Sequence, residues 1–309
     1  MAVLGSAADG GPAAAASERG AGSAQVPGEF ASWLQVAPLV IVLGLFFGLP
    51  MVVVLAVSFF DFDHAEIIPT FIFDNYLELF SSNVTLRLYM TSIKYALIVW
   101  AVTLVIGFNV AYFLVFHVRS LLWQIGLFLV CTVPFWTSNI IRMISWIPFL
   151  GRNGIFNEAL IGAGVVHHPL DFLLFSDFAV VVAYVHLFSL FMVVPIFNAM
   201  ARIDKNLLEA ARDAGAGRFR VVAEIVLPLS KTGIALGSIF VITLVIGDSF
   251  VVRTMSGGQS ASVVSALQNE VSALQYPPAA ASAIIMVIIV TLMVAGILRL
   301  VDVRKELAG

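Results

Sequence analysis

Long apolar stretches separated by short polar segments dominate the pattern of the chain. A helix that crosses the hydrocarbon core of a membrane needs about 20 mostly apolar residues. Six stretches come close to or exceed this length: 36–60, 95–116, 121–141, 178–200, 232–252 and 279–298. Because backbone polar groups find no water inside lipid, each is predicted to be a helix, with kinks or local helix breaks at prolines such as Pro134 and Pro195. The pairs Gly44–Gly48 and Gly233–Gly237 have the G-x-x-x-G spacing that permits close helix packing.

The composition agrees with an all-α membrane protein of six transmembrane helices. Of the 309 residues, 61% are hydrophobic and only 11% are charged, whereas soluble domains carry about 25% charged residues. Such a chain has too few charges to cover a water-facing surface, which excludes a large soluble catalytic domain and a nucleic-acid-binding domain. Residues 1–30 differ, being rich in Ala, Gly and Ser without an apolar face. We expect them to be a disordered tail that precedes a membrane domain over 31–309.

The distribution of Lys and Arg predicts the orientation. Six spans place both termini on one side of the membrane. That side carries eleven Lys and Arg residues, against five on or near the other side. Cytoplasmic loops carry the excess of positive charge, so both termini are predicted to be cytoplasmic.

The cytoplasmic segment 201–231, between the fourth and fifth spans, has the most specific pattern. Asp204 is a good N-cap for a helix that begins at Lys205. Gly215 follows this helix, where a left-handed C-cap is favoured. A second helix over 218–226 is expected to stop near Pro228. The residues by themselves predict a helix-turn-helix unit, which is either a charged connector or a docking element.

A resemblance to a known family decides between these two interpretations. Glu209-Ala210-Ala211, three further residues, Gly215, nine further residues and Ile225-Val226-Leu227-Pro228 match the pattern EAA-x3-G-x9-I-x-L-P in full. This resembles the signature loop of the permease subunits of binding-protein-dependent ABC importers. The run from Pro134 to Asn139 with Arg142 and Trp146, the segment 150–154, Gly247-Asp248 and Gly257-Gly258 are similar to the spermidine/putrescine branch.

The resemblance implies how the chain works and with what it assembles. The loop's first helix is expected to fit a cleft on a cytoplasmic ATPase, present in two copies. The coupling residues it implies are Glu209, Ala210, Ala211, Arg212, Asp213, Gly215, Ile225, Leu227 and Pro228. Further expected partners are a periplasmic substrate-binding protein, a second and different permease chain, and the lipid bilayer of a bacterial inner membrane, with no nucleic acid.

The sequence itself contains no nucleotide site of the P-loop type, which requires a Gly-Lys pair. None of its four lysines follows a glycine. We therefore expect no catalytic residue and no cofactor on this chain, with ATP and Mg²⁺ on the partner ATPase. The single cysteine, Cys131, excludes an intramolecular disulfide, and the pair His167-His168 is too small a ligand set for zinc. No metal site is predicted.

Polar and aromatic residues in the third, fourth and fifth spans form a candidate substrate path. They are Trp136, Ser138, Asn139, Arg142, Trp146, Tyr184 and Asp248. Charged residues inside a membrane are costly and commonly functional. Either Arg142 and Asp248 form an ion pair that joins two helices, or both line the path, with aromatic faces available to an amine. His186 is expected to make a hydrogen bond between helices.

Two questions stay open at this level. A secondary transporter driven by protons, with Asp248 and His186 as relay groups, is the alternative to an ATP-driven permease. A polytopic membrane enzyme is disfavoured, since no catalytic pair with recognisable spacing occurs. Asp248 and the aromatic residues favour a cation such as spermidine, putrescine or a related amine, whereas Arg142 suits the carboxylate or phosphonate of an opine or phosphonate substrate.

Overall fold

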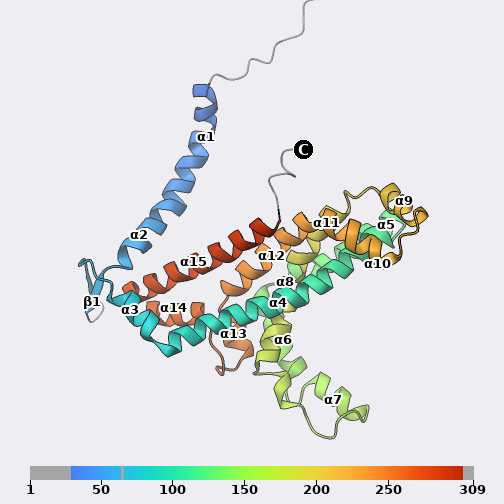
Figure 1. Cartoon of the computed structure of the whole chain (residues 1–309). Coiled ribbons are helices and arrows are strands. Elements are labelled where there is room, and N and C mark those ends of the chain that lie inside the picture. Colours follow the sequence, from blue (N-terminus) through green and yellow to red (C-terminus); the bar gives the residue numbers. More distant parts are fainter. Residues whose placement is uncertain (1–28, 64–65, 302–309) are drawn as a thin grey trace, which may run out of the picture. The chain divides into compact units, whose positions relative to one another are not determined.

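The computed structural model describes residues 29–63 and 66–301, and this part of the chain is mostly helical (Figure 1). Its helices are α1 (Glu29–Leu43), η1 (Gly44–Gly48), α2 (Leu49–Val57), α3 (Asp74–Ser81), α4 (Asn83–Phe116), α5 (Leu121–Thr132), η2 (Val133–Trp136), α6 (Asn139–Leu150), α7 (Ile155–Gly162), η3 (Asp171–Leu173), α8 (Asp177–Met200), α9 (Lys205–Asp213), α10 (Arg218–Val221), η4 (Val222–Val226), α11 (Leu227–Leu229), α12 (Lys231–Ile246), α13 (Phe250–Met255), α14 (Val263–Ser272) and α15 (Tyr276–Leu300). The strands β1 (Asp61–Asp63) and β2 (Glu66–Ile68) form an antiparallel hairpin. The all-α prediction is confirmed, and the chain divides into a unit that ends at Val52 and one that begins at Val53.

The first unit consists of α1, the π-helical turn η1 and the start of α2. Its helix begins at Glu29, so the last two residues of the predicted tail are helical, and the rest of that tail lies outside the described residues. The added Cβ of an alanine at Gly44 would meet nothing within 4 Å. Gly44 therefore mediates no close packing among the described residues.

The second unit is built around α4, α8 and α12, which pack against one another. Their contact surfaces contribute large buried side chains, among them Tyr95, Tyr184, Met192 and Ile196. Gly233 lies directly against the backbone oxygen of Pro195, and Gly237 lies against Met192. The predicted close packing at this glycine pair is confirmed, and it joins α12 to α8 within the chain.

The third and fifth predicted spans are broken. α5 and η2 end at Trp136, and the helical segment that begins at Asn139 turns away by 91° (Figure 1). Thr137 is extended, and Pro134, which lacks an N–H, lies in the 3₁₀ turn η2 that precedes it. The predicted stretch 121–141 is therefore interrupted near Pro134, where a kink or a local helix break was expected. α12 likewise ends at Ile246, and a break precedes α13, which corrects the prediction of one helix over 232–252.

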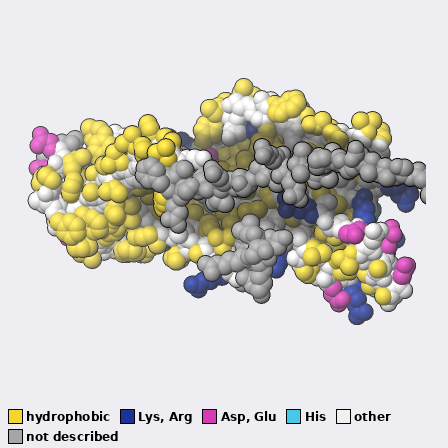
Figure 2. Space-filling model, turned by 90° about the horizontal axis from the view of Figure 1, so that it is seen from above, with side chains coloured by type: hydrophobic (Ala, Val, Ile, Leu, Met, Phe, Trp, Pro, Cys, Tyr) yellow, Lys and Arg dark blue, Asp and Glu magenta, His cyan; other side chains and the backbone are white. Residues whose placement is uncertain are grey.

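Four helical segments are long and apolar enough to cross a membrane, and the number is six if each bent pair of helices counts as one span. The predicted stretches 178–200 and 279–298 correspond closely to α8 and α15. α4 begins at Asn83, well before the predicted start at 95. In the face that Figure 2 presents, hydrophobic side chains cover most of the described surface, as expected for a protein in contact with lipid.

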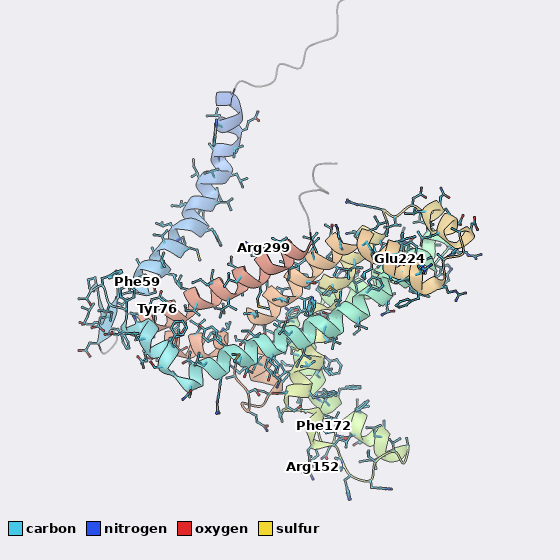
Figure 3. The ribbon with its side chains drawn as sticks, in the orientation of Figure 1. Phe59, Tyr76, Arg152, Phe172, Glu224 and Arg299 are labelled. Carbon is cyan, nitrogen blue, oxygen red and sulfur yellow. The ribbon has the colours of Figure 1, made fainter. Side chains whose placement is uncertain are left out.

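A small cap of aromatic side chains lies beside the hairpin. Phe59 stacks on Phe71 at 4.7 Å between ring centroids, and Tyr76 contacts Phe59 at 5.3 Å (Figure 3). The Asn75 side-chain amide donates to the carbonyls of Ser58 and Phe60. These contacts fix α3 to the segment that leads into the hairpin, and α3 in turn packs against α15.

Candidate functional site

The segment between α8 and α12 folds as the predicted helix-turn-helix unit. The carboxylate of Asp204 accepts a 2.9 Å hydrogen bond from the amide of Asn206 and so caps the start of α9. This satisfies one of the backbone donors that a helix leaves free at its N-terminus. The predicted cap and the predicted first residue, Lys205, are both confirmed.

Gly215 ends α9 in the left-handed conformation, with a φ of +87°. The amide of Gly215 donates to the carbonyl of Arg212, and the amide of Ala216 donates to that of Ala211. This pair of bonds is a Schellman motif, in which glycine at the left-handed position avoids the steric cost of a side chain. The turn directs the chain from α9 into α10.

The second helix ends at Leu229, close to Pro228 as predicted. It runs from α10 through the π turn η4 into α11, which contains Pro228. Proline lacks an N–H and its ring crowds the carbonyl four residues earlier, so a widened π turn just before it accommodates the ring without ending the helix.

One side of the helix-turn-helix unit is buried against the core, and the other side is exposed. Leu208, Val221 and Val226 are buried in the main core of the second unit. Most of the expected coupling residues are exposed: Glu209, Ala210, Arg212, Asp213, Gly215, Leu227 and Pro228. Ala211 and Ile225 are partly buried. The anchored side ties the unit to the helices, while the free side is available to a partner.

An exposed aromatic residue was missed in the sequence. The Phe219 side chain is 86% exposed, beside the turn at Gly215 and Gly217. Its signal was present, since it is a large apolar residue between Arg218 and Arg220 in a polar segment. Figure 3 shows Glu224 on the same helix-turn-helix unit. Its carboxylate forms an ion pair with Arg220 at 3.4 Å.

Tyr184 and Asp248 of the predicted path are brought together. Tyr184 is fully buried in α8, and its hydroxyl lies 3.1 Å from Oδ1 of Asp248. The same oxygen accepts a 2.8 Å bond from the amide of Val251. Asp248 thus lies in the break between α12 and α13 and fixes the start of α13.

Arg142 is buried in α6 and makes no ion pair with Asp248. Its Nη2 donates to Oδ1 of Asn139 at 2.6 Å and to the carbonyl of Thr137, and the guanidinium lies over the Phe135 ring at 5.1 Å. Its Nε and Nη1 are buried without a hydrogen-bond partner. The proposed ion pair between Arg142 and Asp248 is therefore wrong, because Arg142 bonds to Asn139 while Asp248 bonds to Tyr184 and Val251.

The remaining path residues divide into two groups. Trp146 donates from its indole to Nδ1 of His186 at 3.0 Å, so His186 makes the hydrogen bond between helices that was expected of it. Trp136 is 78% exposed and Ser138 is exposed in the break before α6. The path residues thus make three separate hydrogen-bonded contacts: Arg142 with Asn139, Trp146 with His186, and Tyr184 with Asp248.

Within residues 29–63 and 66–301, no group of three or more His, Cys, Asp and Glu side chains is placed to hold a metal ion. The sequence prediction of no metal site concerned His167 and His168, and both belong to this described part.

Comparisons with known proteins identify the class. No known protein-family profile matches the chain. The spermidine/putrescine transport system permease protein PotB of Escherichia coli (strain K12) is 33% identical over 254 residues, which cover 81% of this chain and 90% of that protein. The protein of the same name from Haemophilus influenzae is 33% identical over 224 residues, covering 72% and 77% of the two chains.

The fold gives an independent comparison. A chain in the crystal structure of a bacterial alginate ABC transporter, in complex with an alginate pentasaccharide-bound periplasmic protein, superposes with a TM-score of 0.69. The match covers 87% of this chain and 92% of that one at 16% identity, which establishes the fold. The chain is a permease subunit of an ABC importer, a transport component and not an enzyme. It belongs to the family of PotB spermidine/putrescine permeases, as the loop signature indicated.

Proposed function

We propose that the chain forms one half of a translocation path, and that the unit α9–α11 transmits the work of a cytoplasmic ATPase to it. The observation that carries the proposal is the two-sided character of this unit. Leu208, Val221 and Val226 anchor it in the core shared by α4, α8 and α12, while Glu209 and Ala210 are exposed. A partner that grips the exposed side moves the attached helices as rigid bodies.

The exposed side chains of this unit suit contact with a partner protein. Ala210 is small and permits close approach, Glu209 offers a charge-assisted hydrogen bond to a basic group, and Phe219 offers an apolar anchor. Two ATPase copies would hold ATP and Mg²⁺, one gripping this chain and one gripping a second, different permease. A periplasmic binding protein would deliver the solute at the opposite end of the path. Each of these ligands acts through its differential affinity for two conformations.

The substrate class proposed first is a polyamine or a related amine. The names of the relatives include spermidine and putrescine. On this chain, the half-buried carboxylate of Asp248 and the Tyr184 ring beside it are groups that bind an ammonium. The second candidate is an opine or a phosphonate, and it is favoured by Arg142, whose Nε and Nη1 are buried and unpaired. Replacing Asp248 by Asn and Arg142 by Gln separates the two, because each should weaken the uptake of one class only.

The proposed orientation follows from charge. Both termini and the unit α9–α11 lie in the cytoplasm of a bacterial cell, since the excess of Lys and Arg lies on that side of the inner membrane. The proposed division of the chain is an N-terminal tail over 1–30 and a membrane domain over 31–309.

The coupling role is tested in proteoliposomes that contain the assembled importer. Gly215→Pro and Glu209→Lys should abolish ATP-driven uptake while the variant chain still inserts and reaches the membrane. Glu158→Lys on α7 is the control, because Glu158 is exposed and far along the chain from the loop. Undiminished uptake by both loop variants contradicts the proposal. Uptake without any ATPase, with a pH dependence lost in Asp248→Asn, favours the proton-driven transporter instead.

A further inference from the structure

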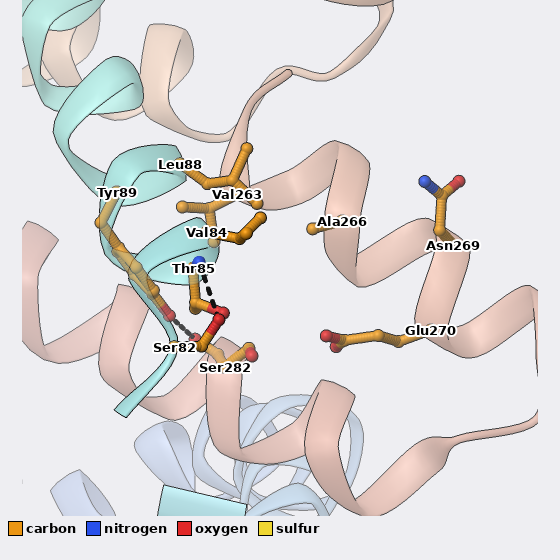
Figure 4. A pocket seen from close by; sticks show the side chains of 10 residues that line it. All are labelled: Ser82, Val84, Thr85, Leu88, Tyr89, Val263, Ala266, Asn269, Glu270 and Ser282. Carbon is orange, nitrogen blue, oxygen red and sulfur yellow. Dashed lines mark hydrogen bonds between the residues drawn. The ribbon is translucent and has the colours of Figure 1, made fainter. Parts of the chain in front are cut away.

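A pocket of about 260 Å³ with polar and apolar walls lies between the start of α4, α14 and the start of α15 (Figure 4). It is lined by Ser82, Val84, Thr85, Leu88, Tyr89, Val263, Ala266, Asn269, Glu270 and Ser282. None of the predicted coupling or path residues is among them. A second cavity of about 180 Å³ shares Ser82, Thr85, Glu270 and Ser282 with the first and adds Glu78 and Gln275. Glu270 is therefore part of the wall between two adjoining spaces.

One carboxylate oxygen of the partly buried Glu270 lacks a hydrogen-bond partner. Its side chain points into the cavity, toward Ser282 and Thr85 (Figure 4). Its Oε2 is fully shielded from solvent and accepts no hydrogen bond. Burial and the negative charge of Glu78 raise the pKa of Glu270. A shielded acceptor without a donor costs about 1–3 kcal/mol, and more when it is charged.

The neighbouring groups do not supply the missing donor. The Tyr89 hydroxyl lines the same cavity, but it donates to the carbonyl of Ser282 at 2.7 Å. The Ser82 hydroxyl accepts a bond from the amide of Thr85. No Lys or Arg lines either cavity. The site thus contains two carboxylates and no cation from the described part of the chain.

The opposite wall defines what kind of cation fits. Val84, Leu88, Val263 and Ala266 form an apolar side next to the carboxylate. A cavity needs only about 10–15 Å³ to hold one water, so this one has room for an organic group. A metal ion fits less well, because the described residues offer no cluster of three metal-ligating side chains. An apolar wall beside a carboxylate matches an alkyl chain that ends in an ammonium.

We propose that this cavity binds a primary alkylammonium group, with Glu270 as its carboxylate and the apolar wall against its methylenes. Two sources offer that chemistry: a free amine, or the ethanolamine headgroup of a phospholipid beside the membrane-spanning helices. The site is distinct from the pair Tyr184 and Asp248, and the proposal does not depend on which solute the chain transports.

The test uses the full chain, assembled with its transporter partners in lipid nanodiscs. Propylammonium binding is measured by titration in nanodiscs of phosphatidylcholine, which has no primary amine. The wild type should bind, and Glu270→Gln should weaken binding tenfold or more, since the charge-assisted hydrogen bond is lost. Ala266→Leu, which fills the apolar wall and keeps the carboxylate, should weaken binding as well. Glu158→Gln is the matched control on a distant exposed acid and should leave binding unchanged.

The same titration in phosphatidylethanolamine nanodiscs distinguishes the sources. Weaker binding of propylammonium there identifies the lipid headgroup as the natural occupant, and equal binding identifies a free amine. Equal affinities of the wild type, Glu270→Gln and Ala266→Leu, or no binding by the wild type in phosphatidylcholine, overturn the proposal. Loss of transport in the loop variants leaves this result unaffected, so the two proposals fail separately.

Discussion

The hydroxyl of Tyr184 donates a 3.1 Å hydrogen bond to Oδ1 of Asp248, and this contact joins α8 to the break between α12 and α13. The two residues are 64 positions apart in the sequence. The carboxylate also accepts a hydrogen bond from the amide of Val251. The Asp248 side chain therefore contacts α8 and also caps the start of α13. The break in α12 is therefore held in place from α8.

Replacing Tyr184 by Phe should destabilise the folded chain. Among the described residues, no other side chain donates to the Asp248 carboxylate. Loss of a donor to a shielded charged group costs about 1–3 kcal/mol, and a lower midpoint of thermal unfolding is expected. Tyr112→Phe is the control, since the Tyr112 hydroxyl makes no hydrogen bond within the described part, while its ring packs against the core and would be kept. Equal midpoints for the two variants would show that the bond contributes nothing.

Gly233→Ala should loosen the contact between α12 and α8. An added Cβ would overlap the backbone oxygen of Pro195 and lie 2.7 Å from Cβ of Ala199, so the helices must separate. Forcing a methyl into a packed contact costs roughly 1–3 kcal/mol. Gly296→Ala on α15 is the matched control, because its Cβ meets nothing within 4 Å. Thermal unfolding of both variants in detergent measures the difference, and a neutral Gly233→Ala contradicts the close approach.

Gly215→Ala should impair coupling through the backbone alone. At a φ of +87°, any other residue is strained, although the added Cβ meets no atom within 4 Å. The strain costs of order 1–2 kcal/mol. A turn that relaxes to relieve this strain changes the direction in which α9 is held. ATPase activity stimulated by the loaded binding protein should fall. Gly217→Ala, in an extended conformation and equally open space, should retain that activity. If the two variants behave alike, the left-handed turn is not required.

Glu270 should make stability decrease as the pH rises. Burial and the charge of Glu78 raise its pKa above the ordinary value of 4.5. The folded state then holds its proton more tightly than the unfolded state. The resulting stabilisation is complete below pH 4.5 and is lost as the pH rises through the pKa of the folded state. Unfolding midpoints of the wild type and of Glu270→Gln are measured from pH 4.5 upward. The midpoint of the wild type should fall relative to that of the variant as the pH rises. Parallel curves would contradict the raised pKa.

Local features of the functional loop were predictable because neighbouring residues determine them. Asp204 caps α9 through a bond to an amide two residues away, and Gly215 adopts its left-handed conformation at the end of the same helix. The helix ends at Leu229, near Pro228 as predicted, whereas the π turn that precedes the proline was not anticipated. Glu270 was missed, since a missing hydrogen-bond partner is a property of the folded chain.

By itself, the sequence determined that this protein is a helical membrane protein, which segments are apolar enough to lie in lipid, and which loop carries the family signature. Those properties depend on composition and on short-range spacing. The tertiary structure decided that Arg142 lies with Asn139, and Asp248 with Tyr184. It also decided where the third and fifth spans break. Such choices depend on how α4, α8 and α12 pack, and packing brings together residues whose separation in the sequence carries no signal.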